Sequence, residues 1–191
     1  MRKLIYIHGF NSSSSSAKAR IILENLRGLD SPPEFLCPSL PDKPYSAVNV
    51  ISKLLKACQM DQVVLVGSSL GGFYATWLSH HYGCKSVLIN PAITPHLDLE
   101  DYLGQQRNLH TNIQYDFNRQ HLDELSELYV GNLLEYNRFF LMHTTGDHLL
   151  DWRVARSRYR YSRQLIVWGG DHGFSEFHRY LQSVFEFAEV K

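Results

Sequence analysis

The chain has 191 residues, of which 44% are apolar and 20% charged, proportions typical of a folded globular domain rather than a disordered segment. Nineteen lysines and arginines balance nineteen aspartates and glutamates, so the formal charge is zero and no net field would attract nucleic acid or an anionic membrane. The length predicts a single domain over residues 1–191. We therefore expect no nucleic-acid partner.

The apolar run at the start of the chain, residues 4–7, is too short for a secretion signal. No window reaches the roughly 18 uncharged apolar residues that a membrane-spanning helix needs. The three cysteines, Cys37, Cys58 and Cys84, are odd in number and lack C-x-x-C spacing, which favours reduced thiols in the core. We expect a cytoplasmic protein without a membrane span.

Short apolar runs that end in polar or glycine-rich turns recur along the chain and predict strands buried on both faces of a parallel sheet. The clear runs are residues 4–7, 63–66, 86–89, 139–142 and 165–168, and a weaker run at 34–37 is flanked by prolines and predicts an edge strand. Apolar positions at helical spacing lie between them, over residues 19–26, 47–58, 70–78 and 174–188. The alternation predicts an α/β, three-layer domain with a mostly parallel sheet of about six strands.

One long segment interrupts this alternation. Residues 94–136 contain no strand-like run, whereas the pieces at 97–103 and 122–134 have helical spacing. Long insertions in compact domains are more often functional than plain connections. We expect a small helical cap at about 94–136, with Leu97, Leu99 and Leu103 shaping a pocket.

The segment Gly67-Ser68-Ser69-Leu70-Gly71 is a G-x-S-x-G motif that directly follows a predicted strand and opens a predicted helix. This context is the one that a nucleophile elbow requires, because the glycines on either side permit the tight turn. Ser69 would then stand at the sheet edge, at the amino end of a helix. The same glycines fit neither a P-loop nor a dinucleotide-binding fingerprint, since the lysine and the second glycine are missing.

A serine nucleophile needs two backbone N–H donors for the oxyanion that forms during acyl transfer. One donor belongs to the residue after the nucleophile, which is Leu70. The other comes from the loop after a neighbouring strand, where His8-Gly9-Phe10 stands, so we expect the N–H of Phe10. We expect His8 to brace this loop rather than to act as a base.

The base and its orienting acid follow from chain order, which in this type of fold is serine, acid, histidine. His172 lies in Gly169-Gly170-Asp171-His172-Gly173, after the last predicted strand. Asp147 follows the preceding strand and is the preferred acid. Asp151 fits better as the N-cap of a helix that begins at Trp152, and Asp171 adjoins the histidine, but both stay open as alternatives.

These motifs together resemble the YqiA-type family of small bacterial esterases in the α/β-hydrolase superfamily. The matching segments are residues 5–13, 66–72, 90–92, 102–104, 145–147 with 150–151, and 169–172. The resemblance implies a serine esterase that hydrolyses carboxylic esters, or acyl thioesters, through an acyl-enzyme intermediate. It implies Ser69, Asp147 and His172 as the triad, a small-molecule ester as substrate, and neither a cofactor nor a metal.

Two other functions remain open at this point, an acyltransferase with the same triad and a non-catalytic binding protein on the same fold. The arginines between Arg153 and Arg163 read as a solvated face, with a contact to an anionic substrate group such as a phosphate as the alternative. The pattern leaves acyl length and oligomeric state open.

Overall fold

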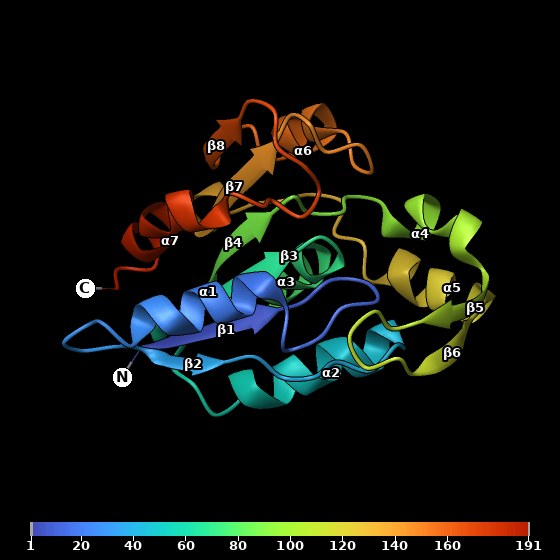
Figure 1. Cartoon of the computed structure of the whole chain (residues 1–191), viewed down its shortest axis with the longest axis horizontal. Coiled ribbons are helices and arrows are strands. Elements are labelled where there is room, and N and C mark those ends of the chain that lie inside the picture. Colours follow the sequence, from blue (N-terminus) through green and yellow to red (C-terminus); the bar gives the residue numbers. More distant parts are fainter. Residues whose placement is uncertain (1, 191) are drawn as a thin grey trace.

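Six parallel strands form the central sheet of the computed structural model, which describes residues 2–190 (Figure 1). The strands are β1 (Lys3–Ile7), β2 (Glu34–Leu36), β3 (Val63–Ser68), β4 (Lys85–Ile89), β7 (Phe139–Thr144) and β8 (Arg163–Val167). Their order is β2-β1-β3-β4-β7-β8, and every neighbouring pair is parallel. The predicted six-stranded α/β sheet is confirmed, including the edge position of the strand near residues 34–37.

Helices cover both faces of this sheet, as a parallel sheet requires. On one face lie α1 (Ala17–Leu26) and α7 (Leu181–Phe187), and on the other lie α2 (Pro44–Leu55), α3 (Leu70–Tyr82) and α6 (Trp152–Arg158). Alternate residues of each strand point to opposite faces: Leu4 and Tyr6 pack toward α1, whereas Ile5 and Ile7 pack toward α2 and α3. The core therefore consists of two apolar layers separated by the sheet.

Short 3₁₀ turns complete the connections, η1 (Met60–Gln62), η3 (Tyr136–Arg138) and η4 (Phe177–Tyr180). The helix predicted over residues 174–188 is wrong at its start, where the chain forms a turn and then η4 before α7. Phe174 has a φ of 51°, which an α-helix does not accommodate. Trp168, placed by the sequence in a buried run, follows β8 and is 82% exposed.

The insertion between β4 and β7 lies at the carboxyl ends of the strands, at the right of Figure 1. It comprises α4 (Pro95–Asp98), η2 (Glu100–Tyr102), β5 (Gly104–Arg107), β6 (Gln114–Phe117) and α5 (Arg119–Glu127). The expectation that this segment lacks strands is wrong, because β5 and β6 pair as an antiparallel hairpin. Both strands are short and polar and pack on one face only, so they lack the apolar run that marks the central strands.

None of the helices in residues 2–190 is long and apolar enough to cross a membrane. Within the same residues, no group of three or more histidine, cysteine or acidic side chains is arranged to hold a metal ion.

Candidate active site

Ser69 lies in a sharp turn between β3 and α3 with φ of 55° and ψ of −122°, a strained conformation for a residue with a side chain. Its N–H donates to the carbonyl of Ile89 at 3.0 Å, and its own carbonyl accepts from Ala92 at 3.1 Å. A Cβ on Gly71 would lie 2.0 Å from the carbonyl oxygen of Ile7, and a Cβ on Gly67 would lie 2.3 Å from that of Gly71. Only glycine fits at these two positions, so the motif is a requirement of backbone packing.

The structure brings Ser69, His172 and Asp147 together from three loops at the carboxyl edge of the sheet. The Oγ of Ser69 lies 3.0 Å from Nε2 of His172, and Nδ1 of His172 lies 2.7 Å from Oδ2 of Asp147. When Nδ1–H donates to the carboxylate, Nε2 is left free to accept the proton of the serine hydroxyl. The three side chains thus form one continuous chain of hydrogen bonds.

The side chain of Asp147 is completely shielded from solvent. Burial alone would raise the pKa of this carboxyl group, but the hydrogen bond and charge of His172 and the N–H groups of Leu149 and Leu150 outweigh it. These contacts hold the pKa of Asp147 below its ordinary value. The carboxylate is therefore kept ionised and oriented toward the imidazole.

The two alternative acids are engaged elsewhere. Asp151 accepts the N–H of Arg153 at 2.9 Å and pairs with its guanidinium, and so it caps α6 as expected. Asp171 accepts the hydroxyl of Ser175 at 2.6 Å. Among the described residues, Asp147 is the one of the three candidate acids whose carboxylate contacts His172.

Asn90, the first residue of the matching segment 90–92, is a buried side chain for which the sequence predicted no role. It follows β4 with φ of 41°, and its amide nitrogen donates to the carbonyls of Asp171 and His172, each at 3.0 Å. Its amide oxygen accepts the N–H of Thr144 at 2.9 Å. Asn90 therefore connects the loop that carries His172 to the end of β7. An asparagine that directly follows a buried strand at this edge was the available signal.

The N–H groups of Phe10 and Leu70, the expected oxyanion donors, donate to no acceptor within residues 2–190. Gly9 brings the first loop close to the nucleophile, because a Cβ there would lie 3.1 Å from the Cβ of Ser69. His8 braces the loop, as expected: its Nε2 accepts the N–H of Leu40 at 3.2 Å. Burial lowers the pKa of His8.

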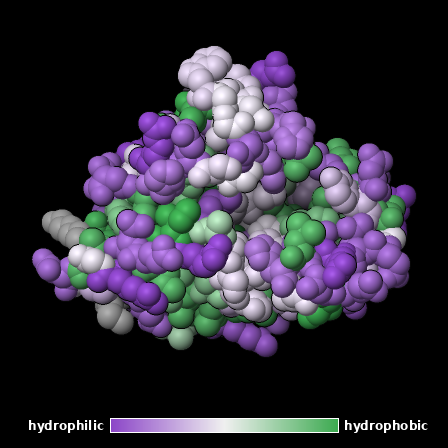
Figure 2. Space-filling view, viewed as in Figure 1, coloured by the Kyte–Doolittle hydropathy of each residue, from purple (hydrophilic) through white to green (hydrophobic). Residues whose placement is uncertain are grey.

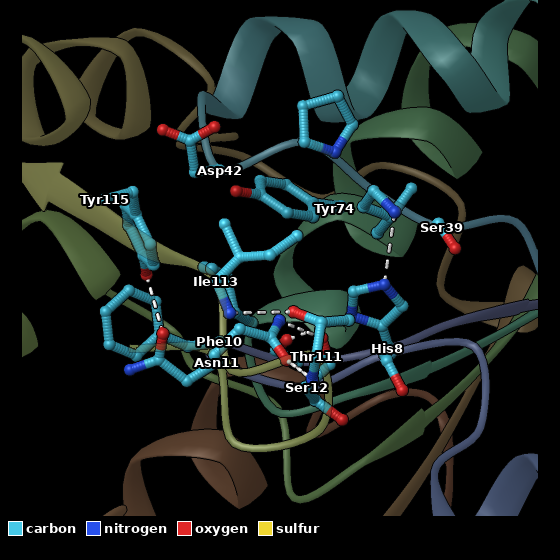
Figure 3. A pocket seen from close by; sticks show the side chains of 16 residues that line it. His8, Phe10, Asn11, Ser12, Ser39, Asp42, Tyr74, Thr111, Ile113 and Tyr115 are labelled. Carbon is cyan, nitrogen blue, oxygen red and sulfur yellow. Dashed lines mark hydrogen bonds between the residues drawn. The ribbon is translucent and has the colours of Figure 1, made fainter. Parts of the chain in front are cut away.

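A cavity of about 360 Å³ opens beside these donors (Figure 3). It is lined by residues 8–13, by 39–42, by Leu70 and Tyr74 of α3, and by Asn108, Thr111, Ile113 and Tyr115 of the β5–β6 hairpin and its loop. Figure 2 shows a hollow to the right of the centre of the face, beside the carboxyl ends of the strands in Figure 1. We call the cavity of about 360 Å³ the hairpin pocket. Leu97, Leu99 and Leu103 do not line it, so the expectation that they shape a pocket is not met here.

The arginines of α6 and its exit lie largely on the surface. Arg153 pairs with Asp151, and Arg158 donates to the hydroxyl of Tyr129 and the carbonyl of Val130. A second cavity of about 660 Å³ runs past these arginines and shares no lining residue with the hairpin pocket.

The sequence profile of a family described as "Uncharacterised protein family (UPF0227)" matches residues 3–189. The chain belongs to the UPF0227 family. A UPF0227 protein from Serratia proteamaculans is 23% identical over 98% of this chain and 99% of its own length. Another, from Shewanella woodyi, is 32% identical over 48% of this chain and 52% of its own length. The expected relation to the YqiA-type group of α/β-hydrolases is confirmed.

Solved structures share the fold of this UPF0227 chain. Est1E from Butyrivibrio proteoclasticus matches with a TM-score of 0.70 at 12% identity, over 100% of this chain and 89% of that protein. Alpha/beta hydrolase domain-containing protein 10 from mouse matches with a TM-score of 0.69 at 15% identity, over 96% and 89% of the two chains. The esterase domain of a Rhodothermus marinus protein matches with a TM-score of 0.66 at 16% identity, over 96% and 84%. The fold is that of the α/β-hydrolases.

Proposed function

We propose that this UPF0227 protein is a serine hydrolase that cleaves carboxylic esters or acyl thioesters through an acyl-enzyme intermediate. The observation that carries the proposal is the hydrogen-bond chain from the Ser69 hydroxyl through His172 to the buried carboxylate of Asp147. Nucleophile, base and orienting acid in this mutual geometry are what acyl transfer requires. The esterases among the proteins of the same fold support the reaction class.

In the proposed first half-reaction, Nε2 of His172 takes the proton of Ser69 while Oγ attacks the carbonyl carbon. The negative charge that develops on the carbonyl oxygen is stabilised by the N–H groups of Phe10 and Leu70 and by the amino end of α3. Asp147 holds Nδ1–H of the imidazole and stabilises the imidazolium. The imidazolium then gives its proton to the leaving alcohol or thiol, and the acyl group remains on Oγ.

In the second half-reaction, the same imidazole takes a proton from water as the water oxygen attacks the acyl carbonyl. The tetrahedral intermediate collapses, and Oγ of Ser69 leaves with the proton that His172 returns. The products are a carboxylic acid and the free enzyme. Every proton transfer in this cycle uses His172, so no other titratable side chain is needed.

The proposed substrate is a small acyl ester that the protein meets in the cytoplasm. Cys37, Cys58 and Cys84 are all free thiols, which supports a reducing compartment. Burial raises the pKa of Cys37 to about 11 and of Cys84 to about 12, so these thiols stay protonated and are not nucleophiles near neutral pH.

The test is hydrolysis of p-nitrophenyl acetate and acetyl thioesters by the wild type and by Ser69→Ala. We expect the variant to fold and to lose on the order of 10⁶ in kcat, the loss that follows removal of a triad nucleophile. A fluorophosphonate probe should label the wild type and not the variant, which separates an enzyme from a binding protein. Added alcohol or thiol acceptors distinguish hydrolysis from acyl transfer, since a transferase would give the exchanged ester as its main product. Retained hydrolysis by folded Ser69→Ala protein would refute the proposal.

A further inference from the structure

The lining of the hairpin pocket includes one charged side chain, which has no role in the proposed reaction. Among its sixteen lining residues there is no lysine, arginine or glutamate, and the single carboxylate is that of Asp42. His8, the lining imidazole, has its pKa lowered by burial and is neutral near pH 7. A group that enters this pocket from the oxyanion donors therefore meets negative charge and no positive charge.

The carboxylate of Asp42 contacts a side chain of the insertion. Its Oδ2 lies 3.4 Å from Nε2 of His121, a buried side chain of α5. Nδ1 of His121 lies in the capping box of α5, 3.2 Å from the backbone nitrogen of Asn118, and its Nε2 faces the carboxylate. The insertion thus fixes one oxygen of Asp42 and leaves the other, Oδ1, without a protein donor in residues 2–190. Figure 3 shows the carboxylate at the edge of the pocket.

The hydroxyl of Tyr74 is a second polar group without a protein partner. The residue is only 3% exposed, yet no hydrogen bond of its hydroxyl occurs within the described part of the chain. Figure 3 shows this hydroxyl below Asp42 in the view, pointing into the cavity. Tyr115, in contrast, donates its hydroxyl to Asn11 at 2.7 Å. Tyr74 and Asp42 therefore form a pair of hydrogen-bonding groups that a ligand could satisfy.

We propose that the hairpin pocket selects substrates whose acyl group ends in a hydrogen-bond donor, a protonated amine in first place and a hydroxyl group in second. The inference rests on the proposed function, because it takes Ser69 as the point to which the acyl group is bound. The donor end would satisfy Asp42, which can only accept, and Tyr74, which can accept as well as donate. A plain alkyl end would offer no partner to the buried Tyr74 hydroxyl and no donor to the Asp42 carboxylate, whose side chain is 40% exposed, and an anionic end would face that carboxylate.

The size of the pocket agrees with a short acyl group. Its volume of about 360 Å³ lies at the lower end of the range of roughly 300 to 1,000 Å³ for ligand pockets. The apolar side chains of Phe10, Leu40 and Ile113 line the space and would contact the methylene groups of such a chain. The pocket thus combines an apolar wall with a polar, acidic end.

The test measures kcat/KM for three p-nitrophenyl esters with the same number of acyl carbons, the hexanoate, the 6-hydroxyhexanoate and the 6-aminohexanoate, and for the matching eight-carbon set. We expect the amino ester to be preferred over the plain ester in at least one of the two lengths. In Asp42→Asn the ratio of amino ester to plain ester should fall roughly tenfold, because the charged acceptor is lost while the shape is kept. In Tyr74→Phe the ratio of hydroxy ester to plain ester should fall by a smaller factor.

The matched control is Asp123→Asn, which removes the same charge from an exposed position on α5 outside the pocket. It should leave both ratios unchanged. If hydrolysis depends on Ser69 but kcat/KM is equal for the plain, hydroxy and amino esters, the pocket inference is overturned. The proposed function would still stand. A preference for the amino ester that persists in Asp42→Asn would also overturn it.

A binding measurement keeps the inference testable if no ester is hydrolysed, a result that would count against the proposed function. NMR titration of the Ser69→Ala protein with 6-aminohexan-1-ol and hexan-1-ol compares the binding of an amine end with that of an alkyl end, with no ester bond to be cleaved. We expect tighter binding of the amino alcohol, with its shifts confined to the hairpin pocket, and loss of this difference when Asp42→Asn is added. Equal binding of the two alcohols would contradict the inference.

Discussion

At the scale of single residues, the site depends on a few side chains whose alternatives are engaged elsewhere. Asp147 has both oxygens in use, one toward His172 and one toward two backbone N–H groups, and it is shielded from solvent. Asp151 and Asp171 have comparable positions in the sequence but cap a helix and hold a serine, respectively. The chemistry of the carboxyl group is the same in all three, so their contacts decide their roles.

The first prediction separates the three aspartates by their asparagine variants. Asp147→Asn should lower kcat by about 10⁴, because an amide favours the wrong imidazole tautomer and does not stabilise the imidazolium. Asp151→Asn should change kcat little, since asparagine caps a helix about as well as aspartate. Asp171→Asn should lower kcat only modestly, because it acts through the loop that also carries His172. The measurement is kcat of the three variants on one ester. An active Asp147→Asn enzyme would remove Asp147 from the proposed triad.

The second prediction concerns Asn90 as a positioning residue. Asn90→Ala removes the bonds that hold the carbonyls of Asp171 and His172, so the imidazole should be less well aligned with Ser69. We expect kcat to fall about 10- to 100-fold with KM nearly unchanged, because small misplacements are costly to the chemical step. The rate of labelling by a fluorophosphonate should fall in parallel.

Ser86→Ala is the control for this variant. Ser86 lies on β4, is buried like Asn90, and donates to the carbonyl of Ala75, away from the site. It should lower the free energy of unfolding without lowering kcat at temperatures where the protein is folded. An equal fall of kcat in both variants would mean that Asn90 matters for stability alone.

At the scale of elements, the β5–β6 hairpin is hydrogen-bonded to the loop that carries Phe10, the proposed oxyanion donor. Leu109 donates its N–H to the carbonyl of Asn11 at 2.9 Å, and the amide of Asn108 donates to the carbonyl of Ser12 at 2.7 Å. The ring of Phe10 packs edge to face on that of Phe117, with centroids 5.2 Å apart. The hairpin therefore forms a wall of the pocket and also supports the backbone of Phe10.

The third prediction follows from this wall. Ile113→Ala should reduce the preference for hexanoate over acetate about three- to tenfold, because it removes apolar contact with the longer chain only. Leu97 is exposed like Ile113 and belongs to the same insertion, but it does not line the pocket, so Leu97→Ala should leave the preference unchanged. The ratio of kcat/KM for the two p-nitrophenyl esters is the measurement. A larger change in Leu97→Ala than in Ile113→Ala would assign the pocket to α4 rather than to the hairpin.

At the scale of the whole molecule, stability should fall as the pH falls below about 6.5. Burial lowers the pKa of both His8 and His143 below the ordinary value of 6.5. Below pH 6.5 the unfolded chain binds protons that the folded chain does not yet bind, so protonation favours unfolding until the folded pKa values are reached. The contribution of Asp147 lies in a separate, lower window, since its stabilisation is lost only below the ordinary carboxyl value of 3.8.

Urea unfolding at pH 7.5 and 5.5 tests this fourth prediction. The free energy of unfolding should be smaller at pH 5.5, and the difference between the two values should shrink in His143→Gln, which cannot take up the proton. His143 is completely buried on β7 and does not contact the proposed nucleophile, so the ester kinetics of this variant provide a check on its folding. An unchanged difference in His143→Gln would show that the burial of His143 is not its source.

The sequence by itself determined the central sheet, because strands buried on both faces must be continuously apolar and the helices between them must carry an apolar stripe. It also located the elbow, since the close approach of the backbone there leaves no room for a Cβ at Gly67 and Gly71. These features are local in the chain, and so they are visible as runs and spacings. The family relation rests on the same motifs.

Only the tertiary structure decided the contacts between segments distant in the chain. The choice among three aspartates, the bonds of Asn90 to the loop 81 and 82 residues away, and the placing of Asp42 beside Tyr74 depend on which loops meet at one edge of the sheet. The hairpin in the insertion was missed because its polar strands are stabilised by packing against the loop after β1 and not by an apolar run of their own. Spacing along the chain fixes which elements form, whereas the contacts between those elements decide which side chains can act together.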